Sequence, residues 1–320
     1  MAKEKILVIG ANGQLGSALT KALRLQHGQE QVIATDIHLP TDGNNYLPFE
    51  ILDATDASKM SFLIERYRIT QIYHFATSMS AKSEINPLKT WELNMNSLFN
   101  VLEAARAHHL KKVFFPSSIA VFGRNTPRLN TPQDTLRTPE TVYGMSKVAG
   151  ENWCVYYHNR YDIDVRSLRF PGIISPQKMS DNSAMDYALS IFQKAIKGES
   201  VECFLEGDTR LPMLYIEDAV RATLQLMDAP AKKISIRSSY NLAGVTFTPA
   251  DLIAELTKHI PDLNVTYKPD ARQQIANSLP ESIDDALARK DWGWQPQFDL
   301  SLMVEAVVKD LKKNVKKIDN

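Results

Sequence analysis

Short apolar runs alternate with segments of helical spacing through the first half of the chain. The runs predict strands, at residues 6–9, 31–35, 71–75, 112–115 and 165–170. The segments between them predict helices, at residues 15–25, 57–67, 88–108 and 142–161. Because the strand runs are continuously apolar, we expect a parallel sheet that is covered by helices on both faces. The pattern therefore predicts an α/β fold with a doubly wound parallel sheet.

The regular alternation ends after Pro171. Residues 174–184 mix polar residues and proline without a period, which predicts a loop. Further helices are predicted near residues 186–197, 217–227, 249–259 and 300–313. We expect two units, a larger domain of residues 1–172 plus about 213–245 and a smaller mixed α/β lobe of residues 173–212 plus 246–320. The lobe is expected over the carboxyl ends of the strands, where open sheets of this class bind ligands.

Composition and charge narrow the classes of protein that this sequence can encode. The 320 residues hold 37 basic and 37 acidic side chains, so no net field favours nucleic acid or an anionic membrane. No apolar run approaches the roughly 18 residues of a membrane span, and the first residues lack the apolar stretch of a signal peptide. The two cysteines, Cys154 and Cys203, form no disulfide framework and no paired motif, which favours the reducing cytoplasm.

Three glycines join the first predicted strand to the first predicted helix. They lie in Gly10-Ala-Asn-Gly13-Gln14-Leu15-Gly16, where glycine permits a tight turn and lets backbone amides approach a pyrophosphate. Glycine-rich turns are common, but this placement between strand and helix is typical of the Rossmann fold. The loop therefore predicts a dinucleotide cofactor on the larger domain.

Two acidic residues follow predicted strands at positions suited to the adenosine half of such a cofactor. Asp36 ends the second strand about twenty residues after Gly16, where a carboxylate accepts hydrogen bonds from both ribose hydroxyls and repels a 2′-phosphate. Asp36 at that position would favour NAD over NADP. The alternative interpretation is that Asp36 is an exposed turn residue without a role in cofactor binding. Asp53 follows another short predicted strand, where it could accept from the adenine amino group or act as an acid at a helix N-terminus.

A tyrosine and a lysine four residues apart are the candidates for catalysis. Tyr143-Gly-Met-Ser-Lys147 is the only Tyr-x-x-x-Lys in the chain, and residues four apart share one helix face. A lysine ammonium stabilises the tyrosine phenolate, which can then remove a proton from an alcohol. In isolation, a chance pair on a surface helix is the better interpretation. Ser117 and Ser118 follow the fourth strand, where a serine hydroxyl could hold the substrate oxygen beside Tyr143 or cap a turn.

The order of these motifs resembles that of the extended short-chain dehydrogenases and NDP-sugar epimerases, the NAD-dependent epimerase/dehydratase family. Over its whole length the chain is similar to the short-chain type of L-threonine 3-dehydrogenase. The segments that carry this closer match are Trp91-Glu-Leu-Asn94-Met-Asn-Ser97, Pro116-Ser-Ser-Ile-Ala-Val-Phe-Gly123, Thr141-Val-Tyr143-Gly-Met-Ser-Lys147, Val165-Arg-Ser-Leu-Arg-Phe-Pro171-Gly172, Ser238-Ser-Tyr-Asn-Leu-Ala243 and Ser282-Ile-Asp-Asp285.

The resemblance implies a role for each candidate residue. It implies Tyr143 as general base, Lys147 as the group that tunes it and binds the nicotinamide ribose, and Ser118 rather than Ser117 as the catalytic hydroxyl. Cofactor contacts are expected from the glycine loop, from the two acids and from positions that the resemblance adds. They are Gly10, Gly13, Gln14, Leu15, Gly16, Asp36, Asp53, Phe75, Ala76, Asn94, Tyr143, Lys147, Pro171 and Ile173. Substrate contacts are expected at Ser80, Ser118, Tyr143 and Met185.

The activity implied by the resemblance is NAD-dependent oxidation of L-threonine at C3 to 2-amino-3-oxobutanoate. Phe170-Pro171-Gly172 follows the threonine dehydrogenase pattern, whereas NDP-sugar epimerases usually have asparagine at the position of Pro171. The segment from Ser180 to Met185 departs from that pattern, because it lacks the glycines and threonines of the substrate loop. One alternative is an NDP-sugar epimerase or dehydratase, because Gly207-Asp-Thr-Arg210 loosely resembles a sugar-nucleotide segment. Another alternative is a dehydrogenase for another β-hydroxy acid.

Other classes receive less support from the residues. A catalytically silent NAD-sensing protein needs no tuned base, yet Ser118, Tyr143 and Lys147 are all present. A metal enzyme is not expected, because His108 and His109 point to different helix faces and no His-Glu-x-x-His occurs.

The expected partners follow from composition and from the resemblance. The motifs and the resemblance imply a small-molecule substrate, and the balance of charge and the lack of a long apolar run predict no nucleic acid and no membrane partner. The resemblance implies a homodimer that pairs the helices predicted at residues 88–108 and 142–161.

Overall fold

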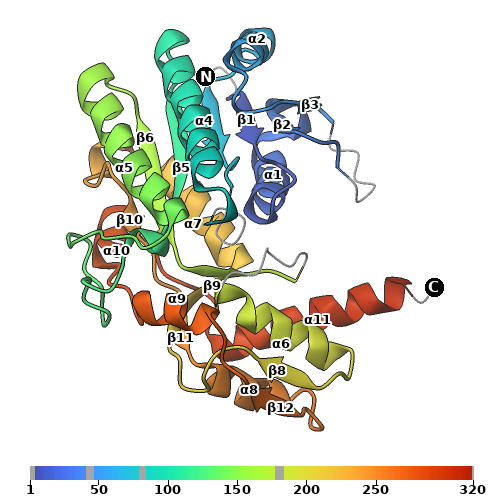
Figure 1. Ribbon diagram of the computed structural model, residues 1–320. Helices are drawn as coiled ribbons and strands as arrows, with labels where there is room; N and C mark the ends of the chain where they lie inside the picture. The colour runs from blue at the N-terminus through green and yellow to red at the C-terminus, as the bar shows by residue number, and fades with distance from the viewer. Residues whose placement is uncertain (1–3, 41–46, 79–83, 177–183, 319–320) are drawn as a thin grey trace.

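A parallel sheet of seven strands forms the core of the larger part of the molecule (Figure 1). The computed structural model describes residues 4–40, 47–78, 84–176 and 184–318, with residues 314–318 as backbone only. The strand order is β10-β6-β5-β4-β1-β2-β3, and each neighbouring pair is parallel. The strands are β1 (Ile6–Ile9), β2 (Val32–Asp36), β3 (Phe49–Ile51), β4 (Gln71–His74), β5 (Lys112–Ser118), β6 (Val165–Phe170) and β10 (Tyr240–Asn241). The expected doubly wound α/β fold is confirmed.

Helices cover both faces of this sheet. They are α1 (Gln14–His27), α2 (Ala57–Tyr67), α4 (Pro87–Ala107), α5 (Val142–Tyr161) and α7 (Ile216–Asp228). Successive side chains of a strand point to opposite faces. Ile6 and Val8 of β1 accordingly join the apolar cluster of α1 and α7, whereas Leu7 and Ile9 join the cluster of α2, α4 and α5. The central strand is thus buried on both sides, as its continuous apolar run predicts.

The smaller part contains two further sheets and five helices of the described chain. Its sheets have the strand orders β11-β9-β7 and β12-β8. Figure 1 shows α6, β8, α8, β12 and α11 gathered below the large sheet. The elements are β7 (Gly172–Ile174), β8 (Val201–Cys203), β9 (Leu211–Tyr215), β11 (Val245–Phe247), β12 (Val265–Tyr267), α6 (Tyr187–Ile196), α8 (Pro249–Thr257), α9 (Arg272–Ser278), α10 (Ala286–Trp292) and α11 (Leu300–Ile318). Short 3-10 helices are η1 (Gln29–Gln31), η2 (Ile119–Val121), η3 (Ala184–Asp186) and η4 (Ala231–Lys233).

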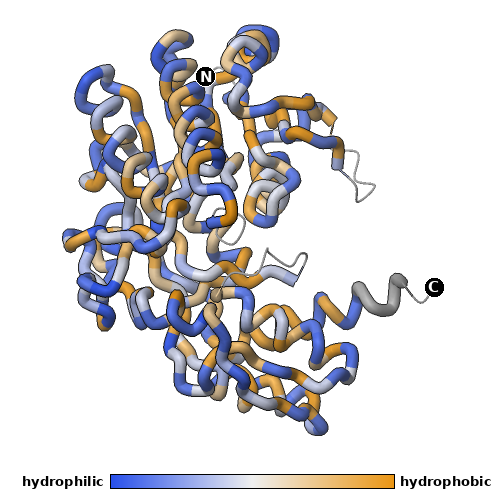
Figure 2. Tube along the Cα trace, viewed as in Figure 1, coloured by the Kyte–Doolittle hydropathy of each residue, from blue (hydrophilic) through white to orange (hydrophobic). Residues whose placement is uncertain are grey.

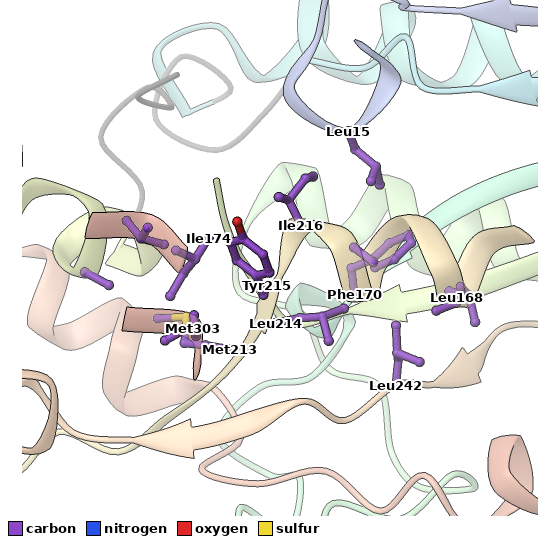
Figure 3. Packing of buried hydrophobic residues seen from close by; sticks show 14 of the residues in the cluster. Leu15, Leu168, Phe170, Ile174, Met213, Leu214, Tyr215, Ile216, Leu242 and Met303 are labelled. Carbon is purple, nitrogen blue, oxygen red and sulfur yellow. The ribbon is translucent and has the colours of Figure 1, made fainter. Parts of the chain in front are cut away.

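One apolar cluster runs through both parts. Leu15 of α1 and Phe170 of β6 lie in the same cluster as Met213 and Leu214 of β9 and Met303 of α11 (Figure 3). Figure 2 shows apolar and polar positions alternating along the helices of both parts. The smaller part therefore shares a continuous core with the large sheet, and the division into two domains stays a prediction.

The structure differs from the sequence-based expectation where elements are short. Residues 174–184 were expected to form one loop, but Ile174 belongs to β7, which pairs with β9. Ala184 begins the 3-10 helix η3. A strand of three residues shows no period in the sequence, so β7, β8, β11 and β12 gave no signal. None of the helices in the described residues is long and apolar enough to cross a membrane.

Candidate active site

The glycine loop is packed so closely that its own backbone requires glycine. Gly10 has a φ of 86°, a conformation that glycine adopts readily. A Cβ on Gly10 would lie 2.7 Å from the backbone nitrogen of Ala76, and a Cβ on Gly16 would lie 2.1 Å from the carbonyl oxygen of Gly10. Gly13 precedes α1 without any side-chain cap. The first amides of α1 therefore face an open loop, which suits a bound anion.

Asp36 is oriented by backbone amides at the rim of this loop. Its Oδ2 atom accepts a hydrogen bond of 2.9 Å from the Asn12 amide, and its Oδ1 atom accepts one of 2.8 Å from the Ile37 amide. Asp53 is exposed and accepts from both the amide and the hydroxyl of Thr55 through Oδ1. The hydrogen bond from the Thr55 amide holds the pKa of Asp53 below its usual value. The N-cap of α2 is Asp56 rather than Asp53.

Residues after β4 form the next part of the loop's surroundings. Phe75 and Ala76 are partly buried against Gly10, and the Phe75 amide donates to the carbonyl of Ile9 at 2.7 Å. Asn94 of α4 is buried and fixes this turn, because its Oδ1 atom accepts from the Ser78 amide at 2.8 Å. Ser80, expected to contact substrate, lies outside the described residues.

Ser118, Tyr143 and Lys147 are brought together by β5 and α5. Thr141 caps α5 by accepting from the Gly144 amide at 3.0 Å, so Tyr143 lies in the first turn. The Lys147 ammonium lies 5.3 Å from the centroid of the Tyr143 ring and donates to the Pro116 carbonyl at 2.8 Å. Ser118 and Tyr143 line the same cavity, and the Ser118 hydroxyl acts to lower the pKa of the Tyr143 phenol. The expected association of these three side chains is present in the structure.

The environment pushes the two titrating groups of this trio toward their neutral forms. Burial raises the pKa of Tyr143 to about 12, although the Ser118 hydrogen bond acts to lower it. Burial lowers the pKa of Lys147 to about 7, although the Cys154 and Glu151 side chains act to raise it. A negative phenolate beside Lys147 would favour the ammonium, so the two groups titrate as a coupled pair.

Ser117 and Ser118 have different partners, because adjacent residues of a strand point to opposite faces of the sheet. The Ser117 hydroxyl is buried and donates to Glu151 at 2.6 Å. Glu151 is itself buried one turn beyond Lys147, and it accepts from Arg169 through both oxygens, at 2.9 and 2.8 Å. Ser117 therefore serves a buried ion pair that links β5, α5 and β6, whereas Ser118 faces the phenol.

A cavity of about 100 Å³, the central cavity, opens beside these side chains. Ser118 and Tyr143 line it from the large sheet, and Met185 of η3 lines it from the smaller part. Pro171 and Gly172, at the junction of β6 and β7, also line it, and a Cβ on Gly172 would lie 2.3 Å from the Met213 sulfur. The remaining lining residues are Ile119, Ala120, Phe122, Glu140, Thr141, Ala184, Ile275, Ser278 and Leu279.

The remaining residues expected to contact the cofactor lie near the glycine loop. Some residues that line the central cavity were not expected from the sequence. Gln14 donates to the Ile173 carbonyl at 3.5 Å, so the start of α1 touches the segment after Pro171. Leu15 packs into the shared core. Thr141 could have been found from its place before the Tyr-x-x-x-Lys motif. No signal near that motif pointed to the lining residues of α9.

Known proteins of similar sequence and structure cover nearly the whole chain. The model of the NAD dependent epimerase/dehydratase family matches residues 6–243. An uncharacterized epimerase/dehydratase of Staphylococcus haemolyticus is 40% identical over 312 residues, which are 97% of this chain and 98% of that protein. The holo form of a GalE-like L-threonine dehydrogenase from Cupriavidus necator is 49% identical with a TM-score of 0.93, over 96% of this chain and 99% of that chain. A monomeric L-threonine 3-dehydrogenase from a metagenome is 42% identical with a TM-score of 0.92, over 97% and 99% of the two chains.

Proposed function

Because this chain belongs to the NAD dependent epimerase/dehydratase family, we propose that it oxidises L-threonine at C3 to 2-amino-3-oxobutanoate. The chain is an NAD-dependent oxidoreductase, and the substrate is the proposed element. The observation that carries the substrate assignment is the central cavity, where Ser118 and Tyr143 face Met185 across a space for a small molecule. The similarity to threonine dehydrogenases over nearly the whole chain supports it.

The larger part has the features that an NAD molecule requires. A side chain would fill the glycine loop, and the uncapped start of α1 offers amides to the pyrophosphate. The Asp36 carboxylate is already oriented toward the rim where the adenosine ribose would lie. We expect Asp53, Phe75–Ala76, Asn94, Lys147 and Pro171–Ile173 to complete the site along the carboxyl ends of the strands. When bound, NAD supplies the acceptor for the hydride that leaves C3.

The proton is handled by the side chains of the central cavity. The phenolate oxygen of Tyr143 removes the proton of the substrate 3-hydroxyl while the C3–H bond breaks, so that C3 and its oxygen become a ketone. The Lys147 ammonium stabilises the phenolate, because an opposite charge favours the ionised phenol. The Ser118 hydroxyl, which lines the same cavity as Tyr143, donates to the substrate oxygen and holds it beside the base.

The cavity also bears on the nucleotide-sugar alternative. Small-molecule sites typically enclose about 300–1,000 Å³, and the central cavity, at about 100 Å³, lies below this range and suits a compact substrate. The segment Gly207–Arg210, which resembles a sugar-nucleotide motif, does not line this cavity. Thr209 instead bonds to the buried Gln273 of α9 at 2.9 Å. These observations favour a small hydroxy acid over an NDP-sugar.

We further propose a homodimer that pairs α4 and α5 of each copy. Large apolar side chains are exposed on these helices, among them Leu88, Trp91, Trp153 and Tyr156. A contiguous exposed apolar patch marks an interaction surface. A cytoplasmic location stays a proposal, supported by two buried free cysteines, Cys154 and Cys203.

Substrate oxidation tests the proposed function. Purified protein with NAD should form NADH, followed by absorbance, from L-threonine in preference to L-serine or 3-hydroxybutyrate. Tyr143→Phe should lower kcat by about 10²–10⁴, the usual effect of losing a general base, while NAD binding is retained. NADH formation from none of these hydroxy acids, together with turnover of a UDP-sugar, would move the assignment to the epimerase alternative.

A further inference from the structure

A second and larger cavity, the outer cavity, lies in the smaller part of the molecule. Its volume is about 410 Å³, which is within the usual range of small-molecule sites. Residues of α6, of β8 and of the segment between β12 and α9 line it. It shares no lining residue with the central cavity, so the proposed oxidation leaves it without a role.

Both signs of charge line the outer cavity in equal number. The charged lining residues are Lys194, Lys268, Arg272, Asp186, Glu202 and Asp270. Two of the cations already have partners, because Lys268 pairs with Glu202 at 3.5 Å and Arg272 pairs with Asp270 at 2.5 Å. A small site that is balanced in this way complements a molecule with both charges better than a simple anion or cation.

The face of α6 supplies the third cation and a hydroxyl. Ser190 and Lys194 are four residues apart and therefore share one helix face. Within the described chain, Lys194 has no ion-pair partner. An ammonium and a hydroxyl side by side can bind one carboxylate of a ligand. The acidic side chains that line the same cavity, such as Glu202, can accept hydrogen bonds from a ligand ammonium.

An apolar wall completes the outer cavity. Phe204 and Pro269 line it, and the guanidinium carbon of Arg272 lies 3.2 Å from the centroid of the Phe204 ring. Arginine stacked on an aromatic ring forms a flat surface that accepts an apolar or aromatic group. The chemistry of the lining therefore suits a free α-amino acid with an apolar side chain.

Neighbouring residues of the same two elements line the outer and central cavities. Met185 of η3 lines the central cavity, and the next residue, Asp186, lines the outer one. In α9, Arg272 lines the outer cavity, whereas Ile275 and Ser278 line the central cavity. The two elements pack directly against each other. A ligand that contacts Asp186 and Arg272 in the outer cavity would therefore restrain the two elements that also line the central cavity.

We propose that the outer cavity is a second site that binds a zwitterionic α-amino acid with an apolar side chain, and that its occupancy alters substrate binding in the central cavity through η3 and α9. A ligand shifts a conformational equilibrium only when it binds one of the two conformations more tightly than the other. The site therefore acts by selecting one position of these two elements, and it regulates the enzyme through the Michaelis constant rather than through the proton transfer.

Binding is tested by calorimetry with three matched probes. L-Phenylalanine carries both charges, 3-phenylpropanoate lacks the ammonium and 2-phenylethylamine lacks the carboxylate. The unmodified protein should bind L-phenylalanine at least about tenfold more tightly than either analogue, because each lost charge-assisted hydrogen bond weakens binding by about that factor or more. Equal binding of all three probes, or no binding of L-phenylalanine, overturns the proposed site.

Two variants locate the bound probe. Lys194→Gln removes the ammonium at nearly constant length, and Ser190→Phe fills the cavity, so both should lower L-phenylalanine affinity at least about tenfold. Lys197→Gln is the matched control, because Lys197 is exposed just beyond α6 and does not line the cavity. Unchanged affinity in both variants places the probe elsewhere and overturns the assignment.

Kinetics test the communication between the cavities. L-Phenylalanine should change KM for L-threonine by several-fold with little change in kcat, and Lys194→Gln should abolish this effect while its basal turnover stays normal. The kinetic measurement rests on the proposed function, whereas the calorimetry does not, so the two proposals fail separately. An effect of L-phenylalanine that survives in Lys194→Gln as simple competition would assign the probe to the central cavity.

Discussion

Two opposing influences act on the phenol of Tyr143. Burial favours the protonated phenol, whereas the Ser118 hydroxyl and the Lys147 ammonium favour the phenolate. The same burial weakens the hold of Lys147 on its proton. A base that must release its proton near neutral pH therefore depends on its neighbour, and the dependence can be measured.

Lys147→Met should move the pH dependence of oxidation to higher pH. The reactive form of Tyr143 is deprotonated, so kcat/KM for the oxidation rises as pH rises through the pKa of the phenol. The ammonium lowers that pKa, and its loss raises it, which leaves less phenolate at any given pH. The pH profile of kcat/KM with L-threonine measures the shift, and NAD affinity should fall as well. A profile with an unchanged midpoint contradicts the proposed role of Lys147.

Asp36→Asn should narrow the preference for NAD over NADP. The amide keeps the size of the side chain but removes the charge that repels a 2′-phosphate. The expected result is weaker NAD binding and unchanged or tighter NADP binding, measured by titration of the two cofactors. Asp53→Asn is the matched control for the preference alone, because Asp53 is expected at the adenine and away from the 2′-position, so its loss should weaken both cofactors alike. Tighter binding of NADP than of NAD by the unmodified protein would refute the assignment.

At the scale of elements, the turn between β1 and α1 combines two demands on glycine. The Gly16 position is closed by the protein itself, because a Cβ there would lie 2.1 Å from the Gly10 carbonyl oxygen. The Gly13 position is less crowded, because a Cβ there would lie 3.3 Å from the same oxygen, a tight contact that a small shift relieves, and its backbone is extended. The packing of the protein itself therefore excludes a side chain at Gly16, whereas at Gly13 it opposes one much less.

Gly16→Ala and Gly13→Ala should consequently fail in different ways. Gly16→Ala should lower the free energy of unfolding by about 1–3 kcal/mol, the usual effect of forcing an extra carbon into a packed site. Gly13→Ala should lower the free energy of unfolding much less than Gly16→Ala does, and it should weaken NAD binding. Thermal unfolding without cofactor and NAD titration separate the two effects. Equal stability losses in both variants would show that Gly13 is structural too.

The elements that could be predicted from the sequence are those with a long apolar run or a fixed motif spacing. β1 is continuously apolar and β5 contains the apolar run Val113–Phe115, while Tyr143 and Lys147 share a helix face by their spacing alone. The three-residue strands of the smaller part are too short to show a period. Ile275 and Ser278 reach the central cavity only through tertiary packing of α9, more than a hundred residues after Tyr143. Glu151 was missed because a buried acid next to a basic strand residue has no sequence signature.

At the scale of the whole molecule, the exposed aromatic residues of α5 contact one another and form a group on the surface. Trp153 and Tyr156 meet edge to face with ring centroids 5.5 Å apart, and Tyr156 leaves 48% of its surface exposed. Trp153 also packs against Phe99 of α4. Such a group is typical of a protein interface, because aromatic side chains are enriched there.

Tyr156→Lys should therefore halve the molecular mass in solution. A charge at the centre of a dimer contact costs far more than one on a free surface. Light scattering after size-exclusion chromatography measures the mass. Leu25→Lys is the matched control, since Leu25 of α1 is 82% exposed and lies outside the proposed contact. The same mass for Tyr156→Lys and the unmodified protein, at the value of one chain, would leave the protein a monomer like its relative from a metagenome.

The residues that line the central cavity come from two separate parts of the chain, and this division affects how a new substrate specificity could arise. The base and the serine are anchored by α5 and β5, whereas Met185, Ile275 and Leu279 come from η3 and the region of α9. Mutations in the second of these parts can reshape the space for a substrate without displacing the groups that move the proton. A directed-evolution library confined to these three codons should therefore yield enzymes with altered selectivity and an unaltered reaction, and diversification by gene duplication could follow the same route.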